Sequence, residues 1–199
     1  MVEKNSQNKI CIVNEDCVYP NQTIYSLERQ KIFSFKNKFT VKDNYQKKDL
    51  YVCELQQHGQ NSIKSMNGNN IVRFDTSFLK HFGIDLYSGN SNTGKDIKIK
   101  HHISLGNSRY TFEIYNKATN KNEEFEVYLY FLKNIKIYHG KKKEGGKLIC
   151  TAEKTKSIPL HYKATIEPNV DTIFALTIVF YFIKLLQRRT AAAASSAAA

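Results

Sequence analysis

Apolar and polar residues alternate over much of the chain, which is the pattern of strands with one buried face. In the segment 33–42, Phe33, Phe35 and Phe39 occupy one parity, whereas serine, lysine and threonine hold the other. Further alternating or short apolar runs lie at 50–55, 71–74, 97–103, 110–114, 125–131 and 160–166. Turn-forming residues separate the runs, so we expect about ten to twelve antiparallel strands. Closure of such a sheet into a barrel would also remove its exposed edges.

A continuous apolar run follows near the C-terminus. Residues 172–183 carry no charge, and Asp171 before them is a good helix N-cap. Basic residues follow where a helix C-terminus favours positive charge, at Lys184, Arg188 and Arg189. The side chains expected at the centre of the fold are Phe174, Leu176, Val179, Phe180 and Ile183. A helix that is apolar on every side is buried either in protein or in lipid.

The length of this run separates the two environments. As a helix, its uncharged residues span roughly 18 Å, whereas a bilayer core needs about 30 Å and some twenty residues. Extension to Leu186 would place Lys184 inside the span, close enough to its end to snorkel. We therefore favour a buried helix over a membrane span. The β-branched and aromatic content of the run also fits a buried strand.

The charge of the chain bears on its partners. The 199 residues include 30 Lys and Arg against 18 Asp and Glu, which gives a formal net charge of +12. Such an excess favours contact with polyanions, which include phosphoinositide head groups, anionic membranes and nucleic acid. The alternative is a compositional bias in a chain rich in Lys, Asn and Ile. The aromatic residues fall mostly on the core parity, which argues against nucleic acid as a partner.

Short groups of lysines are the candidate contacts for an anionic head group. They are Lys36, Lys38, Lys98, Lys100, Lys141, Lys142 and Lys143. Strand residues two positions apart point to one face roughly 7 Å from each other, so two strands with such lysine pairs could clamp one phosphorylated head group. The last three lysines lie in an expected loop. The alternative for any single pair is an ordinary solvated face or a protected sheet edge.

Motifs for catalysis or metal binding are weak. The segment 89–96 approaches a P-loop, but Asp96 stands where a serine or threonine would bind magnesium, and a strand follows instead of a helix. The four cysteines and six histidines lack metal-ligand spacing. We expect no catalytic residue, metal, cofactor or small-molecule substrate. Because the start has no apolar signal region, we expect a cytoplasmic protein, either free, peripheral at membranes or within a cytoskeletal or other large assembly.

Two stretches resemble the LURP-one-related family. The first consists of CVYP at 17–20, LERQK at 27–31, FTVKD at 39–43 and LYVC at 50–53. The second is YKATIEPNVD at 162–171 with the apolar run to Ile183. The family shares its architecture with the Tubby C-terminal domain and, more distantly, with phospholipid scramblases. The resemblance implies a mainly β fold, a closed antiparallel barrel of about 12 strands around a buried C-terminal α-helix.

The expected organisation follows from this likeness. We expect a flexible N-terminal segment at 1–16, the barrel domain at 17–189, and a low-complexity Ala/Ser tail at 190–199 that is either appended sequence or a weakly helical extension. The leading functional hypothesis is a non-enzymatic binding or scaffold module whose surface lysines recognise phosphoinositide head groups, as Tubby domains do, or a protein partner. The alternatives are a structural subunit of a larger assembly and a scramblase-like protein that uses 172–186 as a membrane span.

Overall fold

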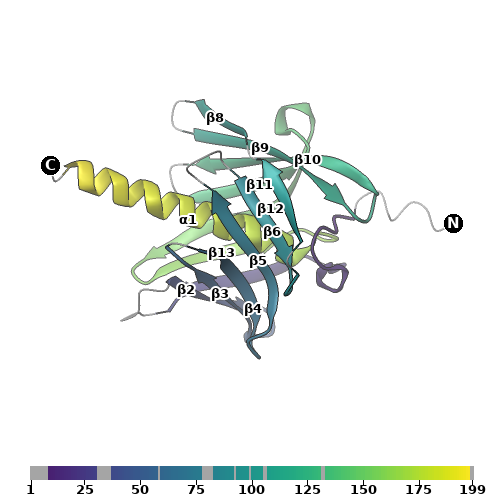
Figure 1. The fold of residues 1–199 in the computed structure, drawn as a ribbon, viewed down its shortest axis with the longest axis horizontal. Coiled ribbons are helices and arrows are strands. Elements are labelled where there is room, and N and C mark those ends of the chain that lie inside the picture. Colours follow the sequence, from purple (N-terminus) through teal and green to yellow (C-terminus); the bar gives the residue numbers. More distant parts are fainter. Residues whose placement is uncertain are drawn as a thin grey trace.

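The computed structural model describes residues 9–30, 37–57, 59–77, 83–91, 93–98, 100–104, 107–130 and 133–197. They form one curved antiparallel sheet and one long C-terminal helix (Figure 1). The strands are β1 (Thr23–Arg29), β2 (Asn37–Asp43), β3 (Lys48–Leu55), β4 (Asn61–Ser65), β5 (Asn70–Ser77), β6 (Gly83–Ser88), β7 (Gly94–Lys98), β8 (Lys100–Ser104), β9 (Asn107–Asn116), β10 (Lys121–Tyr130), β11 (Asn134–His139), β12 (Lys147–Ser157) and β13 (Leu160–Ile166). The helices are the 3-10 turns η2 (Glu15–Cys17) and η3 (Lys142–Glu144) and the α-helix α1 (Thr172–Ala197).

In the described residues, each strand pairs with its neighbours in sequence, except that β7 does not pair with β8 and β1 pairs with β13. In the described part of the chain it has thirteen strands in the order β7-β6-β5-β4-β3-β2-β1-β13-β12-β11-β10-β9-β8. The pairing of β1 with β13 brings the two ends of the domain together, with Leu27 opposite Tyr162. The prediction of a mainly β fold with a C-terminal helix is confirmed.

The prediction of a closed barrel is not supported, because no hydrogen bonds between described residues join the two edges of the sheet. The ladder ends at β7 and β8, which do not pair with each other in the described residues. An odd number of alternating strands leaves both edge strands pointing the same way, and a single residue joins β7 to β8. A hairpin needs antiparallel strands and a turn of about two residues, so β7 and β8 cannot form a hairpin with each other. The edges approach each other, because β7 contacts β9.

The central helix lies inside the curved sheet and extends beyond it toward the C-terminus (Figure 1). Aromatic rings from well-separated strands contact it: Phe39 of β2 lies 5.5 Å from Phe180, and Tyr110 of β9 lies 4.8 Å from Phe182, between ring centroids. The side chains that we expected at the centre are fully buried, at Phe174, Leu176, Val179, Phe180 and Ile183. The helical interpretation of this run is confirmed, and the strand alternative is wrong.

The alternating pattern found the buried faces correctly where it was strong. Phe39 and Val41 of β2 are fully buried, as are Tyr110 of β9 and Phe125 and Val127 of β10. Strands with a weaker pattern were missing from the predicted runs, namely β1, β4, β6, β11 and β12. The run at 97–103, which reads as one strand, is divided between β7 and β8.

The ends of the chain differ from the expected organisation. Ile10, Ile12 and Val13 belong to the core cluster, although we expected residues 1–16 to be a flexible segment. Ile10 forms a β-bridge with Val170, and the backbone N–H groups of Ile12 and Val13 donate hydrogen bonds to Asp171, just before α1. At the other end, α1 continues through the Ala/Ser tail to Ala197. No helix among the described residues is both long enough and apolar enough to cross a membrane.

Candidate ligand-binding site

Of the first predicted lysine pair, the structure describes Lys38. Lys38 lies on the outer face of β2 and is half-buried between neighbours, with its Nζ 2.9 Å from Glu54 Oε1. Lys64 contacts the other oxygen of Glu54 at 3.0 Å, and these two lysines lower the pKa of that carboxyl, Lys38 most strongly. Lys36 lies outside the described residues. Lys38 is therefore engaged in a local ion pair.

The second predicted pair is divided between two strands. Lys98 is the last residue of β7, and Lys100 is the first residue of β8. These strands lie at opposite edges of the hydrogen-bonded ladder, so the prediction that one strand presents both lysines is wrong. Lys100 is exposed, whereas the side chain of Lys98 lies outside the described part.

The third lysine group lies in the connection between β11 and β12. Lys141 forms ion pairs with Glu144 at 3.2 Å and Glu124 at 3.7 Å. The ammonium of Lys142 lies over tyrosine rings, 5.3 Å from the centroid of Tyr128, and donates a hydrogen bond to the Tyr130 hydroxyl. Such cation–π contacts hold an ammonium at the protein surface. Of the three lysines, Lys142 and Lys143 are exposed, and both lie in η3.

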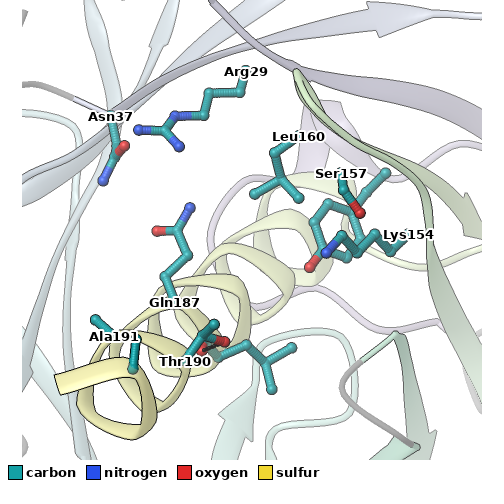
Figure 2. Close-up of a pocket in the computed structure, with 11 residues that line it drawn as sticks. Arg29, Asn37, Lys154, Ser157, Leu160, Gln187, Thr190 and Ala191 are labelled. Atoms are coloured by element: carbon teal, nitrogen blue, oxygen red, sulfur yellow. Dashed lines mark hydrogen bonds between the residues drawn. The ribbon is translucent and has the colours of Figure 1, made fainter. Parts of the chain in front are cut away.

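A pocket of about 480 Å³ lies at the other end of the sheet, where α1 emerges. Its size is in the range of small-ligand sites. Its walls come from β1, β2, the β12–β13 hairpin and the late turns of α1, and the lining residues are Arg29, Asn37, Lys154, Ser157, Leu160, Tyr162, Leu186, Gln187, Thr190, Ala191 and Ala194. Figure 2 shows Arg29, Asn37 and Gln187 extending from different elements toward one space, with Lys154 on the facing wall.

The strand alternation explains why cations face this space. Tyr25 and Leu27 are buried on the inner face of β1, and Arg29 continues the same parity at the end of the strand. On β12, Lys154 continues the parity of the fully buried Ala152. Alternate strand residues share a face, so both cations point inward above the end of the core. A cation at the next alternate position after buried core residues is a pattern visible in the sequence, but it was not among the predicted contacts.

The electrostatics of the pocket are positive. Among the described residues, the lining contains Arg29 and Lys154 but no aspartate or glutamate. Neither cationic head makes a hydrogen bond or ion pair with another described residue. Burial raises the pKa of Tyr162 to about 12, so its hydroxyl stays protonated at neutral pH and can donate. The arrangement offers a guanidinium, an ammonium and neutral donors beside the apolar surface of Leu160 and Leu186.

A further lysine is buried along α1 near this end. Lys184 is 5% exposed, and its Nζ donates a hydrogen bond of 3.0 Å to Asn61 Oδ1. Asn61 is fully buried and donates in turn to the Phe74 carbonyl. Burial, followed by the nearby charge of Arg188, lowers the pKa of Lys184 to about 8. This lysine reinforces the positive character of the end of the sheet that contains the pocket.

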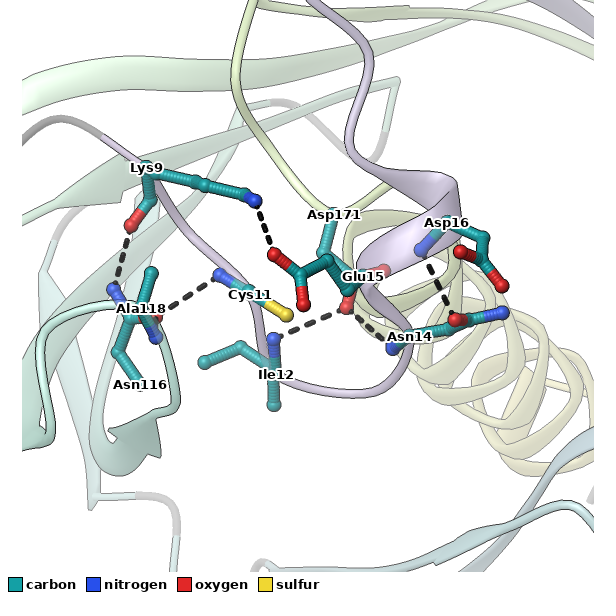
Figure 3. Close-up of polar contacts among 9 residues, drawn as sticks. All are labelled: Lys9, Cys11, Ile12, Asn14, Glu15, Asp16, Asn116, Ala118 and Asp171. Carbon is teal, nitrogen blue, oxygen red and sulfur yellow. Dashed lines mark hydrogen bonds and ion pairs between the residues drawn. The ribbon is translucent and has the colours of Figure 1, made fainter. Parts of the chain in front are cut away.

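The opposite end of α1 is closed by hydrogen bonds (Figure 3). The Oδ2 atom of Asp171 accepts backbone N–H bonds from Ile12, Val13 and Asn14 at 3.1, 2.6 and 3.0 Å. Its Oδ1 atom caps the helix by accepting from the Phe174 N–H at 3.0 Å, in agreement with the expected N-cap. Burial raises the pKa of Asp171 although these four donors act in the other direction.

The buried side chain of Asn116 holds the backbone at Lys9 and Cys11 beside this cap (Figure 3). Asn116 Oδ1 accepts from the N–H groups of Cys11 and Ala118, both at 3.0 Å. Its amide donates to the Lys9 carbonyl at 2.9 Å and to Glu123 at 2.8 Å. Every polar atom of the fully buried Asn116 side chain is thus satisfied.

Metal-ligand chemistry is not assembled in the described part of the chain, which brings together no group of three or more His, Cys, Asp or Glu side chains suited to a metal. The four cysteines are free and buried. Burial raises the pKa of Cys17 to about 11 and that of Cys150 further, so both thiols stay protonated at neutral pH. A protonated buried thiol is a poor nucleophile.

The fold and the pocket define a class of small β domain with a helix enclosed by its sheet. The family model for LURP-one-related proteins matches residues 28–182, and the chain belongs to this family. An X-ray structure of a protein from Arabidopsis thaliana is similar, with a TM-score of 0.61, 14% sequence identity, and coverage of 89% of this chain and 98% of that chain. At this identity the likeness shows the fold alone. No curated protein sequence matches the chain.

Proposed function

We propose that this LURP-one-related domain is a non-catalytic binding module that takes the phosphorylated head group of an anionic lipid into the pocket beside α1. The observation that supports the proposal most strongly is the presence of both Arg29 and Lys154 in a lining whose described residues include no carboxylate. A guanidinium binds phosphate oxygens with a planar fork of donors, and an ammonium adds a compact charge. The net charge of +12 favours the approach of such a ligand.

The apolar wall of the pocket supports a lipid as the source of the head group. Leu160, Leu186 and Ala194 line the same space as the two cations. Ligand sites generally combine an apolar lining with a few polar groups that fix orientation. An amphipathic anion uses both kinds of surface, whereas inorganic phosphate uses only the cations. The proposal replaces the surface lysines with the inward-facing Arg29 and Lys154 as the contact.

Calorimetric titration with a soluble inositol polyphosphate tests the head-group proposal. The double variant Arg29→Ala/Lys154→Ala should weaken binding at least about ten-fold, because two charge-assisted contacts are lost. The matched control is Lys143→Ala/Lys147→Ala, which removes the same charge from exposed positions at the other end of the sheet. Equal losses in both double variants would show that binding follows net charge and not the pocket. Inorganic phosphate at the same ionic strength provides the reference for a free anion.

A further inference from the structure

The tip of the β12–β13 hairpin exposes an unusual side chain. Ile158 is 93% exposed, more than any other large hydrophobic residue in the described part of the chain. Its neighbours on either side of the turn, Ser157 and Leu160, both line the pocket. The hairpin therefore places an aliphatic side chain in solvent at the rim of the cationic pocket.

A single exposed isoleucine is ordinary on a protein surface. The surroundings of Ile158 are what set it apart. Lys156 is exposed on the same hairpin, and Lys154 lies in the pocket wall two residues earlier. Arg29 approaches from the adjoining strand, because β1 pairs with β13. An apolar tip flanked by Lys156, Lys154 and Arg29 matches the interface of an anionic bilayer, where acyl chains lie beneath phosphate groups.

We propose that this end of the molecule docks on an anionic membrane surface, with Ile158 entering the interface and Lys156 contacting lipid phosphates. The pocket then opens toward the bilayer, so that a head group can enter it while its acyl chains stay in the membrane. The docking surface rests on the proposed function only for the occupant of the pocket. The contact of Ile158 with lipid is a separate event with its own readout.

The opposite end of the sheet provides a matched comparison. Tyr45, 66% exposed on the β2–β3 turn, and Met66, 51% exposed on the β4–β5 turn, are the exposed hydrophobic residues of two neighbouring turns there. Lys47 and Lys48 are exposed nearby, so this end also combines apolar and basic groups. It lies away from the pocket, as β2 begins at the pocket and runs toward this turn. A test must therefore report which end meets the membrane.

Tryptophan reporters can make this distinction, because the chain contains no tryptophan. The variants Ile158→Trp and Tyr45→Trp each introduce one fluorophore at an exposed turn. With vesicles that contain phosphatidylserine and phosphatidylinositol bisphosphate, we expect a blue shift and quenching by brominated acyl chains for the reporter at 158 alone. No change at 158, or an equal change at 45, would overturn the proposed orientation. Vesicles of phosphatidylcholine alone should leave both spectra unchanged.

A second variant separates membrane docking from head-group binding. Ile158→Ser should lower partitioning to the anionic vesicles about ten-fold, because it removes an apolar contact without adding a charge. Its affinity for soluble inositol polyphosphate should equal that of the wild type, and Tyr45→Ser should partition normally. Wild-type partitioning of Ile158→Ser would refute the docking surface and leave the pocket proposal standing. Absence of soluble head-group binding, with partitioning that still depends on Ile158, would refute the pocket proposal alone.

Discussion

The two ends of α1 differ in how their polar groups are satisfied. At the N-terminal end, the carboxylate of Asp171 accepts four backbone N–H groups, and the side chain of Asn116 is fully hydrogen-bonded. At the emerging end, Arg29 and Lys154 face a pocket without a described polar partner. Both ends contain charged side chains on inward-facing positions. In the described residues, Asp171 has a full set of polar partners, whereas Arg29 and Lys154 have none.

The difference indicates separate roles for the two ends. An inward charge with a full set of partners stabilises the fold, because removal of the charge leaves several buried donors unsatisfied. An inward charge without such partners adds little to folding and is available to a ligand. The comparison predicts opposite outcomes for the same kind of substitution at the two ends, and the predicted effects on stability decrease from the cap to the pocket.

The largest effect is expected at the helix cap. Asp171→Ala leaves four buried or partly buried N–H groups without their acceptor and should lower the free energy of unfolding by about 3 kcal/mol or more. Urea denaturation followed by circular dichroism measures the loss. The control is Asp16→Ala, an exposed carboxylate in the neighbouring 3-10 turn, which should change stability by less than about 0.5 kcal/mol. Similar small losses in both variants would refute the structural role of the cap.

A smaller loss is expected beside the cap. Asn116→Ala removes the hydrogen bonds to Cys11, Ala118, Lys9 and Glu123 and should lower stability by about 2 kcal/mol. Because two of these bonds hold the chain at Lys9 and Cys11, amide exchange at residues 10–14 should accelerate more than exchange within α1. The exposed Asn122→Ala serves as the control. Uniform acceleration across α1 and the strands would show global unfolding and contradict a local role.

The sequence predicts the cap better than the pocket, for a physical reason. Asp171 precedes an apolar run, and this local pattern is sufficient to recognise an N-cap and a buried helix. Its partners, Ile12 to Asn14, are far away in the sequence, with a separation of 159 residues for Ile12. No local pattern can therefore reveal them. The packed N-terminal segment was consequently expected to be flexible.

The pocket depends on the strand order, which the sequence does not contain. Arg29 and Lys154 line one pocket because a single strand, β13, lies between β1 and β12. The alternation alone places each cation on an inward parity but does not place them in one cavity. The surface lysines were predicted as contacts because they cluster in the sequence, yet Lys98 and Lys100 lie on two different edge strands. Spatial order, more than residue type, determines the candidate site.

An intermediate case lies between the two ends, at Lys184. Its pKa in the folded protein, lowered by burial to about 8, is below the ordinary value of 10.5. Between these two pH values the unfolded chain binds more protons than the folded chain, so raising the pH stabilises the fold through this group. Below pH 8 both states are protonated, and this contribution no longer changes with pH.

The variant Lys184→Met isolates this contribution from the other titrating groups. The stability of the wild type minus that of the variant should be constant below about pH 8 and rise between about pH 8 and 10, at no more than about 1.4 kcal/mol per pH unit. Urea denaturation at pH 7, 8, 9 and 10 measures the difference. Asn61 keeps the Gln56 N–H as a donor in the variant, so the asparagine is not orphaned. A stability difference between wild type and variant that falls as the pH rises would contradict a lowered pKa of Lys184 in the folded protein.

The smallest effect on the empty protein is expected at the pocket. Arg29→Ala/Lys154→Ala should change the free energy of unfolding by less than about 0.5 kcal/mol, because neither cation has a described polar partner to lose. With a soluble inositol polyphosphate at 100 times the wild-type Kd, binding should stabilise the wild type by about 2.7 kcal/mol. A ten-fold weaker affinity would reduce this stabilisation by about 1.3 kcal/mol at the same concentration. A large loss of stability without ligand would place Arg29 and Lys154 with Asp171 among the residues that hold the fold together. Unchanged stability with a reduced ligand effect would identify the open end of α1 as the binding end.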